Sequence, residues 1–176
     1  MKKLPLILIL LTSIILLSGC GIYNLNCFTL PDDIEFLALI QELNTPKKIC
    51  QYMADNFTYE LHIFNILSPY QLYITQKGDC DDFANFAIFI SNYHGYETFL
   101  VKICYKNYAI NHYLAIYKEN GQYNFSDNQY YFSVNYDKFS DIVLLDSQWM
   151  YISYGYTWSK YIVYDYWNNI VEQVTR

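Results

Sequence analysis

The first half of the chain has apolar residues at helical spacing. Residues 31–43 form one such segment, and a Pro-Asp-Asp start favours a helix there. A second helix is predicted over 46–56, because proline fits the first turn of a helix, and Ser-Pro predicts a short third helix over 68–77. The buried stripe of the first helix is predicted to consist of Ile34, Leu37, Ile40 and Leu43.

Residues 79–93 predict the central helix. Asp79 suits the N-cap, and Gly95 suits the C-cap. The polar side chains are expected to form a solvated rim on one side, and the apolar ones a wide stripe that is buried. The predicted rim consists of Asp81, Asp82, Asn85 and Asn92. The predicted stripe consists of Phe83, Ala84, Phe86, Ala87, Ile88 and Ile90.

After Gly95 the hydrophobic period changes from helix to strand. Asn120-Gly121 predicts a tight hairpin between two strands, and residues 136–145 predict a loop with a short helix. Helices followed by an antiparallel sheet indicate an α+β domain, with the central helix packed on the sheet. The predicted strands are 97–105, 109–118 and 122–126, and residues 151–156 and 161–174 together are predicted to add at least one more, with two favoured.

Strand alternation and the hairpin register each predict neighbours of His112. It shares a sheet face with Leu114 and Ile116, and this face is expected to pack on the central helix. If Asn120-Gly121 is a two-residue turn, Asp127 lies opposite Leu114. Asp127 is then a diagonal neighbour of His112, roughly 7 Å away between backbones.

The N-terminus carries an export pattern. A basic start is followed by the apolar run 4–17, which is shorter than the roughly 20 residues of a spanning helix. Leu17-Ser18-Gly19-Cys20 resembles the lipobox of bacterial lipoproteins, although an uncleaved anchor is the alternative. We therefore expect a signal peptide at 1–19, a tether at 20–31 lipidated on Cys20, and one domain at 32–176. The mature protein is then a lipoprotein held at the extracytoplasmic face of the cell membrane.

Charge and composition limit the classes of partner that the protein is expected to bind. Removal of the signal peptide takes two lysines and changes the formal charge from −6 to −8, which argues against a nucleic-acid partner. The 21 tyrosines fit half-buried strands better than a dedicated binding surface.

Four cysteines remain besides Cys20. They form no CxxC pair, and residues 79–82 lack the spacing of a calcium loop, so we expect neither a metal site nor a cofactor. Cys27 and Cys50 are a candidate disulfide pair. Cys104 lies on a predicted strand, as a core residue or a disulfide partner.

Cys80 falls at the first turn of the central helix. Free N–H groups there favour a thiolate, but the adjacent carboxylates oppose it, so the thiol needs a cation nearby. His94 lies about 21 Å along the same helix at 1.5 Å per residue. His62 falls in an irregular segment, which leaves His112 as the candidate.

Four stretches in chain order resemble the transglutaminase-like family, which has a papain-like cysteine peptidase fold. They are Phe57-Thr58-Tyr59, Lys77-Gly78-Asp79-Cys80-Asp81-Asp82-Phe83-Ala84, Asn111-His112-Tyr113 and Ser126-Asp127-Asn128, within about residues 46 to 130. The resemblance implies that Cys80 is the nucleophile, His112 the general base and acid, and Asp127 the residue that orients His112. The oxyanion donors would be the backbone N–H of Cys80 and a second group at Gln76 or near Tyr59.

The resemblance implies amide acyl transfer through a Cys-His-Asp catalytic triad. The expected substrate is a peptide or protein of the cell envelope, and the product arises by hydrolysis, as in a cysteine protease or amidase, or by transamidation. Hydrolysis is favoured, because no closed tunnel that would keep water from a thioester is evident. The alternative is a catalytically inactive envelope binding module that keeps this fold and uses its tyrosines for contact.

Overall fold

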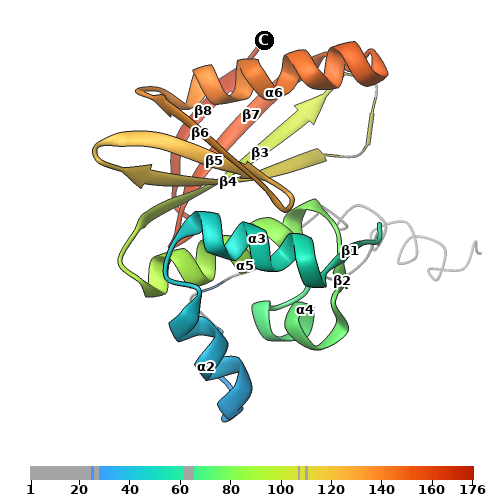
Figure 1. The fold of residues 1–176 in the computed structure, drawn as a ribbon. Coiled ribbons are helices and arrows are strands. Elements are labelled where there is room, and N and C mark those ends of the chain that lie inside the picture. The colour runs from blue at the N-terminus through green and yellow to red at the C-terminus, as the bar shows by residue number, and fades with distance from the viewer. Residues whose placement is uncertain (1–24, 26–27, 62–65, 107, 110) are drawn as a thin grey trace, which may run out of the picture.

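The computed structural model describes residues 25, 28–61, 66–106, 108–109 and 111–176. The predicted signal peptide, Cys20, Cys27 and His62 lie outside these residues. The described chain has three layers: a six-stranded antiparallel sheet, helix α6 on one face, and helices α2 to α5 on the other (Figure 1). This arrangement is α+β, as the sequence predicted.

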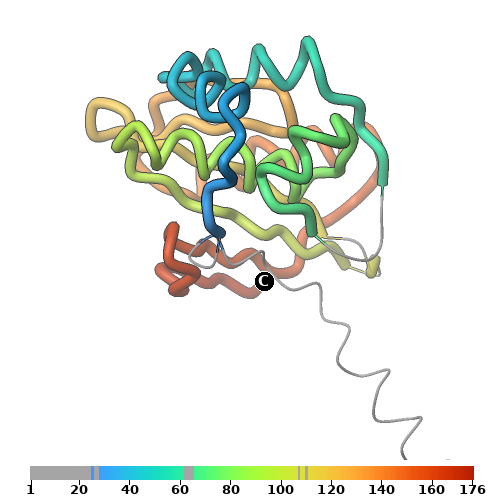
Figure 2. Tube along the Cα trace, turned by 90° about the horizontal axis from the view of Figure 1, so that it is seen from below, coloured from blue at the N-terminus to red at the C-terminus, as the bar shows by residue number. Residues whose placement is uncertain are grey.

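The helices α2 to α5 form the larger layer. A single apolar cluster joins α3 and α5 to the sheet face that carries Leu100, Tyr113, Ala115 and Tyr117. Figure 2 shows this layer from the helical side, with the β7–β8 hairpin along one edge of the sheet. The bounds are α2 (Ile34–Glu42), α3 (Pro46–Asn56), α4 (Pro69–Thr75) and α5 (Cys80–Tyr93).

The strand order in the main sheet is β6-β5-β4-β3-β7-β8. Two short strands, β1 and β2, pair in parallel beside the start of α5. The bounds are β1 (Thr58–Tyr59), β2 (Lys77–Gly78), β3 (Glu97–Tyr105), β4 (Asn111–Glu119), β5 (Gln122–Asp127), β6 (Tyr130–Tyr136), β7 (Trp158–Asp165) and β8 (Ile170–Thr175).

The β4–β5 hairpin has the register that the sequence predicted. Glu119 pairs with Gln122, and Leu114 pairs with Asp127. The turn residues Asn120 and Gly121 both have positive φ, 54° and 86°, as a two-residue turn between twisted strands requires. Asp127 is therefore the diagonal neighbour of His112.

The C-terminal third differs from the sequence prediction. Helix α6 (Phe139–Tyr154) runs well beyond the short helix predicted within 136–145, and the strand predicted at 151–156 is wrong. Its apolar residues Ile142 and Val143 are buried against the sheet, and this packing makes the segment helical despite its strand-favouring aromatics. Strand β6 was not predicted.

Two burial predictions also fail. Ile34 is 82% exposed, because α2 turns Phe36, Ile40 and Leu43 toward the core instead. The sheet face that carries Leu114 and Ile116 packs against α6, not against the central helix α5.

No helix within the described ranges is both long and apolar enough to cross a bilayer.

Candidate active site

Cys80 is the first residue of α5, where the sequence placed it. Asp79 and Asp82 form a capping box that fixes the helix start, and the Phe83 N–H donates to the Asp79 carbonyl at 3.0 Å. Cys80 therefore presents its sulfur where the free N–H groups of the first helical turn gather.

Asp82 and Asn85 are not part of a solvated rim. They are 1% and 2% exposed. Asp82 accepts hydrogen bonds from the Leu67 N–H at 2.6 Å and from the Asp79 N–H at 3.0 Å. Its carboxylate is thus buried because it ties the preceding loop to the start of α5.

Gly78 makes this close packing possible. A Cβ atom at Gly78 would lie 2.7 Å from the Leu72 Cδ1 and 2.8 Å from the Asp82 Oδ2. Because real Cβ contacts are longer, only glycine lets the chain pass between α4 and α5 immediately before Asp79 and Cys80.

The thiol of Cys80 meets the start of strand β4. Cys80 and His112 are hydrogen-bond partners, and the Cys80 Sγ also lies 3.9 Å from the Asn111 carbonyl oxygen, to which the thiol donates. His112 belongs to the sheet face opposite α5. It reaches Cys80 because it is the second residue of β4, at the strand end beside which α5 begins.

The other ring nitrogen of His112 faces Asp127. The His112 Nε2 lies 3.0 Å from the Asp127 Oδ1, and the two side chains are 12% and 24% exposed. The amide of Asn128 donates to the same Asp127 oxygen at 3.0 Å. The three residues predicted as a catalytic triad, Cys80, His112 and Asp127, thus form a continuous chain of contacts.

A second carboxylate approaches the same nitrogen, and the sequence reasoning missed it. The Asp146 Oδ1 lies 3.7 Å from the His112 Nε2, and Asp146 is 1% exposed. The Tyr105 hydroxyl donates to the Asp146 Oδ2 at 3.4 Å. The sequence offered one signal, a single acidic residue directly after the apolar run 142–145. This segment was predicted as a loop with a short helix, and its packing across the sheet was not predicted.

These contacts determine the charges at the site. Burial alone would lower the pKa of His112, but its hydrogen bonds to Asp127 and Cys80 and the charges of Asp146 and Asp127 raise it well above 6.5. Burial raises the pKa of Asp146 to about 6, against the opposing effect of His112. These contacts therefore favour the protonated form of His112.

The pKa of Cys80 is raised overall. Burial is the main cause, and the charges of Asp79 and Asp81 add to it, whereas the hydrogen bond and the charge of His112 lower it. His112 is thus the group that favours the thiolate, against burial and two nearby acids.

Of the two candidate positions for a second oxyanion donor, Tyr59 is the one whose hydroxyl is affected by the charge of Cys80. Its ring is stacked 6.4 Å from that of Phe83, and burial and the charge of Cys80 are the first two causes that raise the pKa of its hydroxyl. Gln76 has an exposed side chain and a left-handed φ of 55°, and its carbonyl accepts from the Thr58 N–H at 2.8 Å. The geometry therefore brings Tyr59, rather than the side chain of Gln76, into the electrostatic environment of Cys80.

A pocket of about 400 Å³ opens beside the histidine and Asp127. Its wall comes largely from the C-terminal end of α6 and the residues after it. The lining residues are His112, Asp127, Asn128, Trp149, Met150, Ser153, Tyr154 and Tyr156.

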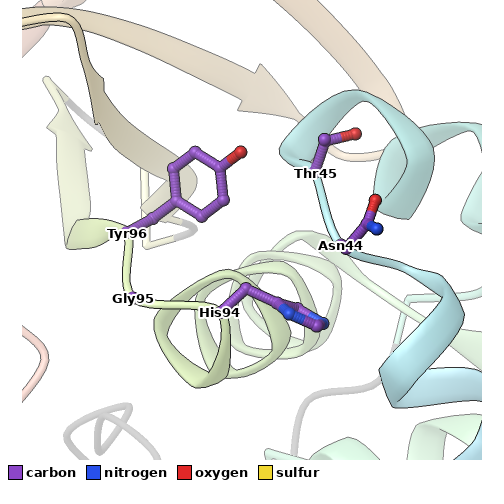
Figure 3. A pocket seen from close by; sticks show the side chains of 5 residues that line it. All are labelled: Asn44, Thr45, His94, Gly95 and Tyr96. Carbon is purple, nitrogen blue, oxygen red and sulfur yellow. The ribbon is translucent and has the colours of Figure 1, made fainter.

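A second pocket, of about 380 Å³, lies at the other end of α5 (Figure 3). It is lined by Asn44, Thr45, His94, Gly95 and Tyr96. The His94 Nε2 contacts the Ile40 carbonyl oxygen at 2.7 Å, so this histidine links α5 to α2. As predicted, it is remote from Cys80.

Two further cysteines, Cys50 and Cys104, lie among the described residues. Cys50 is a buried thiol with 2% exposure, and Cys27, its predicted disulfide partner, lies outside the described residues. Burial raises the pKa of Cys50 to about 12. Cys104 is a free, half-buried thiol on β3.

No protein-family model matches this chain, and no curated protein matches it significantly.

Proposed function

We propose that this chain is a transglutaminase-like enzyme of papain-like fold that transfers acyl groups from amides through Cys80. The observation that carries the proposal is the contact chain from Cys80 through His112 to Asp127. These side chains come from a helix start, a strand start and the end of the next strand. Two of the three were placed by an independent register argument.

In the proposed reaction the Cys80 thiolate attacks the amide carbonyl carbon, and the carbonyl electron pair moves to oxygen. The backbone N–H of Cys80, and a second donor near Tyr59, stabilise that oxyanion. The Nδ1–H of His112 protonates the leaving amine as the C–N bond breaks, which leaves a thioester on Cys80. Asp127 accepts from Nε2–H and keeps the ring oriented.

The thioester is resolved by water, with His112 acting as base. We favour hydrolysis over transamidation because the pocket beside His112 is open to solvent. A peptide or protein of the cell envelope is the proposed substrate. Cys20 is the proposed lipid anchor, which holds the enzyme at the extracytoplasmic face of the membrane.

A non-catalytic binding module is the second candidate. One observation favours it: burial and the charges of Asp79 and Asp81 raise the pKa of Cys80, which disfavours the thiolate. Exposed aromatic side chains near the pocket, such as Tyr154 at 65% exposure and Tyr151 at 63%, would then supply the contact surface.

Trapping of the acyl-enzyme distinguishes the two candidates. The full-length protein is incubated with peptides from cell-envelope extracts, quenched in acid and analysed by mass spectrometry. We expect an acyl adduct on the peptide that contains Cys80, which hydroxylamine removes and which Cys80→Ala lacks. Peptide binding that is equal in wild type and Cys80→Ala, with no adduct, would favour the binding module.

A further inference from the structure

The Nε2 edge of His112 faces two carboxylates, although one is enough to orient an imidazole in a thiol triad. The Asp127 Oδ1 lies 3.0 Å from Nε2, and the Asp146 Oδ1 lies 3.7 Å from it. The three atoms lie within 4.8 Å of one another. One nitrogen and two oxygen atoms therefore lie close enough together to contact one ion.

Asp146 is the residue that the triad does not explain. It is 1% exposed, and its Oδ1 accepts no hydrogen bond from any residue that the structure describes. Among the residues that the structure describes, Asp146 forms an ion pair with His112. The charge of His112 is already balanced by Asp127. Burial of a carboxylate without a full partner is costly, and the two carboxylates at this edge exceed the one positive charge that His112 can supply, so the site has one unbalanced negative charge.

We propose that His112, Asp127 and Asp146 form a binding site for a divalent transition-metal ion such as Zn²⁺, which replaces the proton on the His112 Nε2. The metal–nitrogen bond forms as the N–H bond breaks, and the proton passes to solvent. The ion neutralises the unbalanced charge of Asp146.

The donor set and spacing suit zinc. One imidazole and two carboxylates are common zinc ligands, and an open fourth position is typical of reactive zinc sites. Ligands about 2.1 Å from a tetrahedral ion lie about 3.4 Å apart, close to the 3.0 and 3.7 Å found here. The pocket lined by His112 and Asp127 gives the ion access from solvent.

Metal binding would inhibit the proposed reaction without blocking the sulfur. The ion occupies Nε2, so Nδ1 keeps its proton and still faces Cys80. A metal-bound neutral imidazole is a much weaker acid than an imidazolium, so it protonates the leaving amine poorly. This consequence rests on the proposed function, whereas the binding site itself does not.

The test is a calorimetric titration of the full-length protein with ZnCl₂. Wild type is compared with Asp146→Asn, Asp127→Asn and Asp81→Asn. The last variant is the matched control, because Asp81 belongs to the other carboxylate cluster near Cys80, formed with Asp79 and Asp82. We expect one site, whose affinity falls at least tenfold in the first two variants and is unchanged in the third. Affinity should rise with pH, since binding releases a proton.

A second readout locates the ion. Saturating Zn²⁺ should leave iodoacetamide alkylation of Cys80 undiminished, measured by peptide mapping with Cys104 as the internal reference. Wild-type affinity in both Asp146→Asn and Asp127→Asn would overturn the proposal, and so would protection of Cys80 by zinc, because the ion would then sit on sulfur. Neither result bears on the acyl-enzyme experiment, so the two proposals fail separately.

Discussion

At the scale of single residues, three aspartates make different contacts around the candidate site. Asp127 lies 3.0 Å from the His112 Nε2, Asp146 adds a second carboxylate beside the same ring, and Asp82 accepts from the backbone N–H of Asp79, next to Cys80. Their exposure differs accordingly, from 24% for the Asp127 side chain to 1% for Asp82. Residue type alone does not distinguish these roles.

Asp82→Ala should destabilise the protein and disturb Cys80. The change leaves the Leu67 and Asp79 N–H groups without their acceptor, and each unsatisfied buried group costs about 1–3 kcal/mol. Urea denaturation should therefore show a free energy of unfolding lower by about 2 kcal/mol or more. Asp55→Ala, on the exposed side of α3, is the matched control and should change it by less than about 0.5 kcal/mol. Equal effects of the two changes would contradict the structural role of Asp82.

At the scale of elements, the junction of α4, β2 and α5 sets the position of the thiol. The Ser68 capping box starts α4, and the pairing of β1 with β2 fixes the chain just before Cys80. Gly78 lies at the point of closest approach, where a side chain has no room.

Gly78→Ala should therefore shift the start of α5. The added methyl group meets the Leu72 and Asp82 side chains below 3.0 Å, and such overpacking typically costs about 1–3 kcal/mol. A lower melting temperature is expected, together with a changed rate of Cys80 alkylation. Lys77→Ala in the same strand is the control, because Lys77 pairs with Glu60 on the surface and both side chains are more than half exposed. Wild-type stability and alkylation in Gly78→Ala would show that the junction tolerates a side chain.

The elements also show what the sequence could and could not predict. Strand alternation and a two-residue turn were enough to place Asp127 beside His112, because both are local rules. The position of Asp146 depends on α6 packing across the sheet, which is a long-range contact. The face assignment failed for the same reason: alternation groups His112 with Leu114 and Ile116, but it does not say which helix covers them.

At the scale of the whole molecule, three groups with raised pKa values change the free energy of unfolding in the same direction as pH rises. Burial raises the pKa of Asp146 to about 6, and burial with a hydrogen bond to Asp79 raises that of Asp81 to about 8. The pKa of His112 is also raised, by its contacts with Asp127 and Cys80. Each group holds its proton more tightly in the folded than in the unfolded state, and protonated Asp81 donates to Asp79. Their stabilisation is therefore complete at low pH and is lost as pH rises through the folded-state pKa values.

We accordingly expect the free energy of unfolding to fall between about pH 4 and pH 8, as measured by urea denaturation at constant ionic strength. Asp146→Asn removes one of these groups and should flatten the lower part of the curve, by on the order of 2 kcal/mol. A stability that rises across this range in wild type, or an unchanged slope in Asp146→Asn, would contradict the assigned charges.

The central claim is that His112 activates Cys80. The most direct measurement is the rate of iodoacetamide alkylation of Cys80 against pH in wild type, His112→Ala and His94→Ala, with Cys104 as the internal reference. Because His112 lowers the pKa of the Cys80 thiol, its removal should move the Cys80 profile to higher pH and slow alkylation at pH 7 by about tenfold or more. His94→Ala should match wild type, since His94 lies at the far end of α5. Identical Cys80 profiles in wild type and His112→Ala would contradict the account.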